Sequence, residues 1–299
     1  MGENAERLAI SGAGTRLRRR AATRSLRAAL ASAGAVLLAV EIAVAAVAPV
    51  ITPASPVAQD LASRLKPPRS VDPSGVRHWL GTDALGRDVL SRIIFGARVS
   101  LIVGCLSVLI SAPLGLAAGV VSAYYGGALD AVIMRIADVQ LAFPFILLVV
   151  AIVAVVGPSL VNLILVLGLS GWVIYARVVR SEAVALCGKE FTEAARAQGA
   201  SDWRIMSRHV VPNTVSSVIV LATATVAYMI LLESSLSFLG LGVQPPTPSW
   251  GGMINEGRNY MPGAWWLSVF PGIAVFSTVV SVNFIGDRLR DLLDPRLTV

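Results

Sequence analysis

The amino-acid sequence predicts an all-α integral membrane protein with six membrane-spanning helices. Of the 299 residues, 55% are hydrophobic and 14% are charged, and the mean hydropathy of +0.72 exceeds that of ordinary soluble domains. The apolar residues gather into six runs long enough to cross a bilayer, and arginines gather immediately before the first run. The predicted spans are 29–51, 99–121, 136–157, 159–178, 214–240 and 265–286.

The N-terminal segment 1–28 is predicted to be cytoplasmic because it is rich in arginine. Its arginines are Arg7, Arg16, Arg18, Arg19, Arg20, Arg24 and Arg27. The arginines that contribute to the net charge of +7 thus mark the cytoplasmic side of the first span. No nucleic-acid partner is expected. Six spans return the C-terminal segment 289–299 to the cytoplasm. A cleaved export signal ending near residues 43–45 is the alternative. The run 29–51 exceeds the roughly 7 to 15 apolar residues of such a signal, which favours an uncleaved span.

The segment 29–98 is predicted to hold the first span and an irregular external connection. Five prolines between Thr52 and Val76 interrupt regular structure and predict no compact domain there. Asp83 and Asp88 bracket Arg87, which raises the alternatives of a metal site and a structural turn. Two carboxylates are too few for a calcium loop, and the guanidinium would oppose a cation, so the structural turn is favoured.

The segment 99–288 is predicted to form the transmembrane core. Arg135 and Asp138 are three residues apart, so on a helix they would be neighbours, whereas Asp130 is poorly spaced to join them. A local ion pair at the membrane edge is the favoured interpretation, and a transport role is the alternative. Pro144 lies inside the third predicted span and should kink or break it. Gly157 and Pro158 are expected to form a tight external turn between the third and fourth spans.

Two carboxylates fall inside apolar runs, Glu41 in the first and Glu233 in the fifth. A charge at such depth is costly, so each should face protein or water. The hydroxyls of Ser234, Ser235 and Ser237 suggest that Glu233 lies on a polar face lining a passage. The other reading, that neighbouring helices satisfy Glu233, is preferred, and it is preferred more strongly for Glu41.

The segment 181–213 is the most polar part of the core and is predicted to lie outside the bilayer. Its charged residues include Arg196, Asp202, Arg204 and Arg208, which lipid would not accept. The pattern predicts two short helices joined at Gly199, which can adopt the left-handed conformation that ends a helix. Ser201 is the expected N-cap of the second helix and Pro212 its end. Trp203, Ile205 and Met206 are expected to anchor that helix against the spans.

The order Glu193, Ala194, Ala195, then Gly199, then Pro212 resembles the EAA loop of bacterial ABC importer permeases. Three further stretches, HWLGTDALGRDVLSR at 78–92, LLESSLSFLGLGVQPPTPSWG at 231–251 and DRLRDLLDPR at 287–296, are similar to the dipeptide, oligopeptide and nickel permease group, and specifically to its C-type subunit. The resemblance covers roughly residues 78–296. His209 and Val211 depart from it, because the superfamily has isoleucine and leucine before the proline.

The resemblance implies a type I ABC importer permease fold in a bacterial inner membrane, with both termini cytoplasmic. The implied ATPase-docking residues are Glu193, Ala194, Ala195, Arg196, Gly199, Asp202 and Pro212, and Glu233, Ser234 and Ser237 are candidate passage residues. The implied partners are membrane lipid, a second permease subunit, two cytoplasmic ABC ATPase subunits or domains, and an extracytoplasmic substrate-binding protein. That binding protein would dock on the external segment 240–263, for which membrane-interface packing is the alternative. Dipeptides or oligopeptides are the expected cargo, and nickel or another small solute is the alternative.

The sequence contains no recognisable catalytic constellation. His78 and His209 are predicted on opposite sides of the membrane, and the phosphate-binding pattern fails because Glu190 follows Gly188 and Lys189. We therefore expect a non-catalytic subunit without a bound cofactor or metal, with ATP and Mg²⁺ on partner subunits. Cys105 and Cys187 fall in different environments, so no disulfide is expected.

Two other classes of function are the alternatives to an ABC importer permease. A proton-coupled secondary transporter would use Glu41 and Glu233 as proton sites, and a membrane enzyme would lack its active site.

Overall fold

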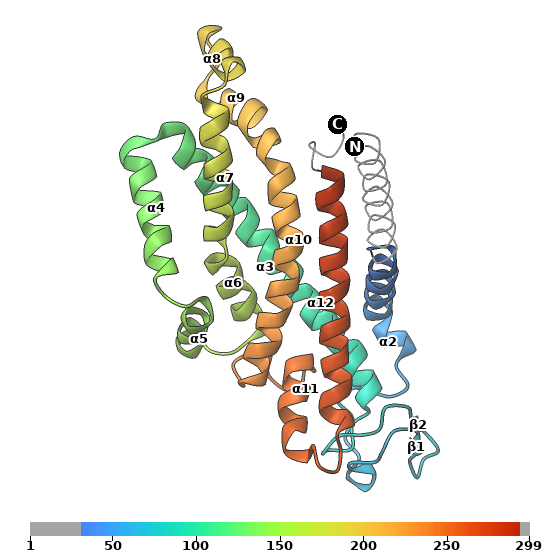
Figure 1. Ribbon diagram of the computed structural model, residues 1–299. Helices are drawn as coiled ribbons and strands as arrows, with labels where there is room; N and C mark the ends of the chain where they lie inside the picture. Colours follow the sequence, from blue (N-terminus) through green and yellow to red (C-terminus); the bar gives the residue numbers. More distant parts are fainter. Residues whose placement is uncertain (1–30, 294–299) are drawn as a thin grey trace, which may run out of the picture.

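The computed structural model describes residues 31–293 and is a helical bundle with a small β-hairpin at one end (Figure 1). Four stretches in this range are long and apolar enough to cross a membrane. They are α3 (Val89–Tyr125), α6 with α7 (Leu160–Ser170 and Trp172–Cys187), α9 through α10 (Asp202–Ile205 and Val211–Phe238), and α12 (Trp266–Leu293). The predicted segment 1–28 and residues 294–299 of the predicted C-terminal segment lie outside the described residues.

Two further predicted spans are helical as well. The helices α4 (Gly127–Leu141) and α5 (Phe145–Val156) form a pair that is bent by 87°. Pro144 is the N-cap residue of α5, so the predicted interruption at this proline is confirmed. In the described part of the first predicted span, a helix covers Ala31–Ala46 and α2 follows at Ala48–Ile51. The predicted helical membrane fold is therefore confirmed, although six spans were predicted and the described residues hold four helices long enough to cross a membrane, or five if the bent pair is one span.

Helix α3 runs diagonally through the bundle and contacts α6, α7 and α10 (Figure 1). It begins after Asp88, whose carboxylate accepts a hydrogen bond from the Ser91 backbone N–H at 2.8 Å. Glycines let α7 approach it closely: a Cβ atom on Gly115 would lie 2.4 Å from the Trp172 carbonyl oxygen, and one on Gly119 would lie 2.6 Å from that of Ala176. Such close backbone approach at small residues is typical of helix packing in membranes.

The bent pair α4–α5 lies at one side of the bundle, with α4 next to α7 (Figure 1). The predicted ion pair between Arg135 and Asp138 is wrong. Asp138 pairs with Arg177 on α7, and Asp130, which was expected to stand apart, accepts two hydrogen bonds from Arg180 at 2.6 and 2.5 Å. The sequence spacing within one helix gave the wrong partners because α7 places two guanidinium groups alongside α4.

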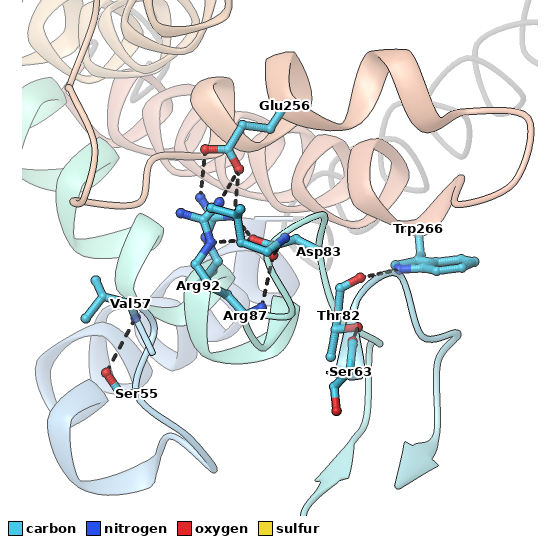
Figure 2. A network of polar contacts seen from close by, with 10 residues as sticks. Ser55, Val57, Ser63, Thr82, Asp83, Arg87, Arg92, Glu256 and Trp266 are labelled. Carbon is cyan, nitrogen blue, oxygen red and sulfur yellow. Dashed lines mark hydrogen bonds and ion pairs between the residues drawn. The ribbon is translucent and has the colours of Figure 1, made fainter. Parts of the chain in front are cut away.

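The segment that precedes α3 is folded against α11 (Trp250–Gly257) and α12 at the opposite end from α8 (Figure 1). It contains a 3₁₀ turn at Leu61–Ser63 and an antiparallel hairpin of β1 (Ser70–Val71) and β2 (Arg77–His78). The Thr82 hydroxyl donates to the Ser63 carbonyl at 2.5 Å, and Trp266 Nε1 donates to the Thr82 carbonyl at 3.3 Å (Figure 2). These bonds give the predicted irregular connection a defined shape.

Candidate functional site

The predicted helical hairpin is formed by α8 (Glu190–Ala197) and α9. Gly199 has φ of +79°, a conformation that glycine adopts without a Cβ clash. The Ala200 N–H donates to the Ala195 carbonyl at 3.1 Å, and the Gly199 N–H donates to the Arg196 carbonyl at 3.0 Å. These two bonds form a Schellman motif, which satisfies the last carbonyls of α8. The predicted left-handed turn at Gly199 is confirmed.

The hairpin presents small and charged side chains at the end of the molecule opposite α11 (Figure 1). Glu193, Ala194 and Arg196 are exposed, and Ala195 is partly buried. Glu193 lies in the first turn of α8 and Arg196 in the last, so both charges complement the helix dipole. Beneath them, the buried Thr192 hydroxyl donates to the Leu186 carbonyl at 2.9 Å. One face of α8 is thus anchored and the other is free for contact.

Tyr124 at the end of α3 contacts both helices of the hairpin. Its hydroxyl donates to the Asp202 carboxylate at 2.7 Å, and the Arg196 guanidinium lies over its ring, 5.7 Å from the centroid. Hydrogen bonding with the Tyr124 hydroxyl is the main cause of a raised pKa at Arg196. Sequence reasoning missed this residue because its partners are about 70 residues away along the chain. The only available signal was an aromatic pair, Tyr124 and Tyr125, at the end of an apolar run.

Pro212 does not end the second helix, contrary to the prediction. A π-helical turn at Met206–Val210 joins α9 to α10. The Val211 N–H donates to the Met206 carbonyl, five residues back, and Pro212 occupies the first turn of α10. The wider π turn accommodates a proline ring that would obstruct an ordinary α-helix. The hairpin is therefore continuous with a membrane-spanning helix.

Two of the three residues predicted to anchor the second helix do so. Ile205 and Met206 are buried, whereas Trp203 is 75% exposed and does not anchor the helix.

Ser201 has the extended backbone of an N-cap, and its carbonyl accepts a hydrogen bond from the Ile205 N–H at 3.0 Å, but its side chain makes no capping bond. His209, whose packing was uncertain, is partly buried with its ring centroid 6.1 Å from that of Phe191.

Glu233, named as a candidate passage residue, is fully buried. Its carboxylate accepts hydrogen bonds from Ser100 of α3 at 2.7 Å, from Ser237 at 2.8 Å and from Ser234 at 3.4 Å. Ser234 and Ser237 are buried with it, and Ser235 is exposed. The serines that suggested a polar passage instead satisfy this carboxylate inside the protein, as the preferred interpretation held.

Glu41 on the N-terminal helix is bonded to α12. Its carboxylate accepts from the Ser277 hydroxyl at 2.9 Å and from the Thr278 hydroxyl at 2.8 Å. These bonds connect two elements far apart in sequence, so they agree with the structural interpretation preferred for this residue.

A buried charge cluster joins the segment before α3 to α11 (Figure 2). Asp83 and Glu256 hold Arg87 and Arg92 between them: Arg87 bonds to both carboxylates, at 2.6 Å and 2.7 Å, and Arg92 pairs with both. The two arginines and Asp83 are almost fully buried. Residues 31–293 contain no group of three or more histidine, cysteine, aspartate or glutamate residues placed to hold a metal ion. The acidic residues around Arg87 belong to a structural turn.

Comparison with known proteins places the chain in a family. Residues 111–299 match the family described as binding-protein-dependent transport system inner membrane component. The chain is 46% identical over 220 residues to the glutathione transport system permease protein GsiD of Pectobacterium atrosepticum, covering 74% of this chain and 73% of that protein. It is 43% identical over 266 residues to a protein of Brucella suis named as a peptide transport system permease, covering 89% and 88%. Among solved structures, the inward-facing MetNI methionine ABC transporter matches with a TM-score of 0.55 at 20% identity, covering 68% of this chain and 96% of that one. That likeness concerns the fold.

Proposed function

Because this chain belongs to the family of binding-protein-dependent transport system inner membrane components, we propose that it is a permease subunit of an ATP-driven ABC importer. The observation that carries the proposal is the α8–α9 hairpin. It presents an exposed docking surface, and it continues through the π-helical turn into the membrane-spanning α10. A push on the hairpin would therefore reach the transmembrane bundle without an intervening flexible loop.

The proposed partners are two cytoplasmic ABC ATPase subunits or domains, a second permease and an extracytoplasmic binding protein. In this arrangement α8 and both termini face the cytoplasm, while the β-hairpin and α11 face outward. The exposed Glu193, Ala194 and Arg196 suit a protein partner, since small residues allow close approach and flanking charges favour correct orientation. ATP and Mg²⁺ would be bound by the ATPases, which supply the energy.

Short peptides are the proposed cargo. The relatives from Pectobacterium atrosepticum and Brucella suis are named as glutathione and peptide permeases, and glutathione is itself a tripeptide. Nickel or another small solute is the alternative cargo. The secondary-transporter alternative loses support, because the two carboxylates it would use are bonded within the protein.

Uptake by the reconstituted complex tests the proposal. Purification of tagged chain from its native membrane should yield a second permease and ABC ATPases, and proteoliposomes of that complex should import labelled peptides when the binding protein and ATP are supplied. Isolation of the chain alone, or uptake driven by a proton gradient without ATP, would contradict the proposal.

A further inference from the structure

His78 is a buried histidine that lies between the β-hairpin and the start of α3. It belongs to β2, where its carbonyl accepts hydrogen bonds from the Arg69 N–H at 2.8 Å and the Gly81 N–H at 3.2 Å. Its side chain is 5% exposed, and its two ring nitrogens face different carboxylates. Nδ1 lies 2.8 Å from Asp88 Oδ1, and Nε2 lies 3.6 Å from Asp72 Oδ2. The imidazole therefore stands between the hairpin and the helix.

Asp88 holds one side of this ring together with the first turn of α3. Its Oδ2 accepts hydrogen bonds from the Ser91 backbone N–H at 2.8 Å and from the Ser91 hydroxyl at 2.7 Å, so this oxygen caps the helix. Its Oδ1 faces the imidazole of His78. An ionised carboxylate only accepts hydrogen bonds, so Nδ1 of His78 carries a proton in this contact.

Asp72 holds the other side of the ring from the turn of the β-hairpin. Its Oδ1 accepts hydrogen bonds from the Ser74 hydroxyl at 2.7 Å and from the Val76 N–H at 2.8 Å. The bond from Ser74 is the main reason that the pKa of Asp72 lies below its ordinary value, and the charge of His78 contributes. Asp72 is therefore ionised at neutral pH, with Oδ2 toward Nε2 of His78.

The proton on Nε2 decides whether the contact with Asp72 is attractive. Within the part of the chain that the structure describes, this buried atom has no hydrogen-bond partner. In the imidazolium both ring nitrogens carry protons, so Nε2 attracts the Asp72 carboxylate. In the neutral ring with a proton on Nδ1, the lone pair of Nε2 faces a negative charge. The same geometry is thus attractive with the charged ring and repulsive with the neutral ring.

The cations near His78 in sequence have other contacts. Arg77 lies over the Trp79 ring, 5.3 Å from its centroid, and the side chain of Arg69 is exposed. Arg87 and Arg92 belong to the charge cluster with α11. Asp72 and Asp88 are therefore the groups that respond to the charge on the imidazole.

We propose that His78 forms a pH-sensitive bridge, in which the charged ring holds the β-hairpin against the N-terminus of α3 and the neutral ring releases it. Histidine changes charge between about pH 5 and 8. Because the bridged ring holds a proton that the released ring can lose, the bridged state binds more protons, and its stability falls as the pH rises. In the proposed orientation the hairpin faces outward, so the bridge responds to external pH. The bridge itself rests on the contacts and not on that orientation.

Hydrogen exchange of the hairpin amides in the purified full-length protein, followed by mass spectrometry, tests the bridge. The N–H groups of Arg69 and Asp72 donate to the His78 and Val76 carbonyls. Their protection factors, which correct for the intrinsic pH dependence of exchange, should fall about fivefold from pH 6 to pH 8.5, as expected for loss of one partly screened ion pair. The amides of α11 are the internal reference and should keep their protection.

Three variants distinguish a titrating bridge from a packing contact. Asp72→Asn keeps an oxygen acceptor for the hairpin turn but removes the charge, and His78→Gln removes the titrating ring, so each should abolish the fall in protection at pH 8.5. Ser74→Ala is the matched control, because it removes a hydrogen bond from the same turn and leaves both charges, so the fall should remain. If His78→Gln does not fold, Asp72→Asn decides. Equal protection at both pH values in the wild type, or a fall that persists in Asp72→Asn, would overturn the proposal.

Discussion

At the scale of single residues, Gly199 shows how one backbone conformation shapes the proposed docking surface. Its φ of +79° ends α8 and turns the chain toward α9. No heavy atom lies within 4 Å of where a Cβ would sit. A side chain there would meet backbone strain alone and would not disturb packing.

Gly199→Val should therefore distort the hairpin by about 1 to 2 kcal/mol of left-handed strain, and more for a β-branched residue, while leaving membrane insertion intact. ATPase association, measured by copurification, should fall. Gly188→Val is the matched control, because Gly188 has φ of −90° and also has no atom near its Cβ position. Wild-type association in Gly199→Val would show that the turn is only a connector.

Glu233 is predicted to be structural. Glu233→Ala removes the acceptor from buried Ser100 and Ser237 and should lower stability by about 1 to 3 kcal/mol, the usual cost of leaving a buried polar group unsatisfied. Glu233→Gln keeps one acceptor and should cost less. Thermal denaturation of the detergent-solubilised complex measures both. Full stability of Glu233→Ala with lost transport would instead restore the passage role.

Local sequence patterns predicted residue roles only where the cause was local. The left-handed turn at Gly199 and the interruption at Pro144 follow from the intrinsic conformations of glycine and proline. The partners of Asp138 and Glu233 depended on which helices lie side by side, and a single sequence does not contain that information. Tyr124 was missed for the same reason.

At the scale of elements, the contact between α3 and α7 depends on two glycines one helical turn apart. Gly115→Ala would place a Cβ atom 2.4 Å from backbone and side-chain atoms of α7, and overpacking of this kind costs about 1 to 3 kcal/mol. Gly272→Ala on α12 meets no atom within 4 Å and is the matched control. The amount of folded protein in the membrane, measured by fluorescence size-exclusion chromatography, should fall for position 115 alone. Equal yields would contradict the assigned packing.

The charge cluster at the other end connects two more elements. Glu256→Ala leaves the buried Arg87 and Arg92 with Asp83 as their only remaining carboxylate in the cluster. Because the Glu256 side chain is 36% exposed, the cost should fall below the about 3 to 5 kcal/mol expected for breaking a fully buried pair. Hydrogen exchange should rise in α11. Asn255→Ala, on the same helix, is the control, and equal exchange in the two variants would show that the cluster does not hold α11.

The apolar runs predicted where the spans lie. They did not predict the full lengths of the helices, the short helix α11 or which helices pack together. Helix α3 begins ten residues before the predicted span, because Asp88 caps it in a protein environment, where polar residues are tolerated. The short helix α11 was not predicted, since its eight residues, WGGMINEG, include three glycines and no clear period. The signal that could have located the α3–α7 contact was the spacing Gly115-x-x-x-Gly119.

At the scale of the whole molecule, the ends of the bundle carry different chemistry. The α8 end bears the exposed hairpin that we propose as the docking surface, and the other end holds the β-hairpin, α11 and the charge cluster (Figure 1). Impermeant thiol reagents should therefore label single cysteines at Ser70 and Thr247 from outside intact cells, and at Arg196 and Thr298 only after permeabilisation. Labelling of position 196 from outside would reverse the orientation and remove the ATPase from reach.

Cross-linking from α8 tests the central claim most directly. A photoreactive amino acid at Ala194, which is exposed on the hairpin, is compared in living cells with one at Val155, which is 87% exposed on α5 away from the hairpin. If the hairpin docks with an ATPase, irradiation should join position 194, but not position 155, to an ABC ATPase identified by mass spectrometry. Absence of any ATPase adduct at position 194, in cells where the complex is assembled, would contradict the proposed function.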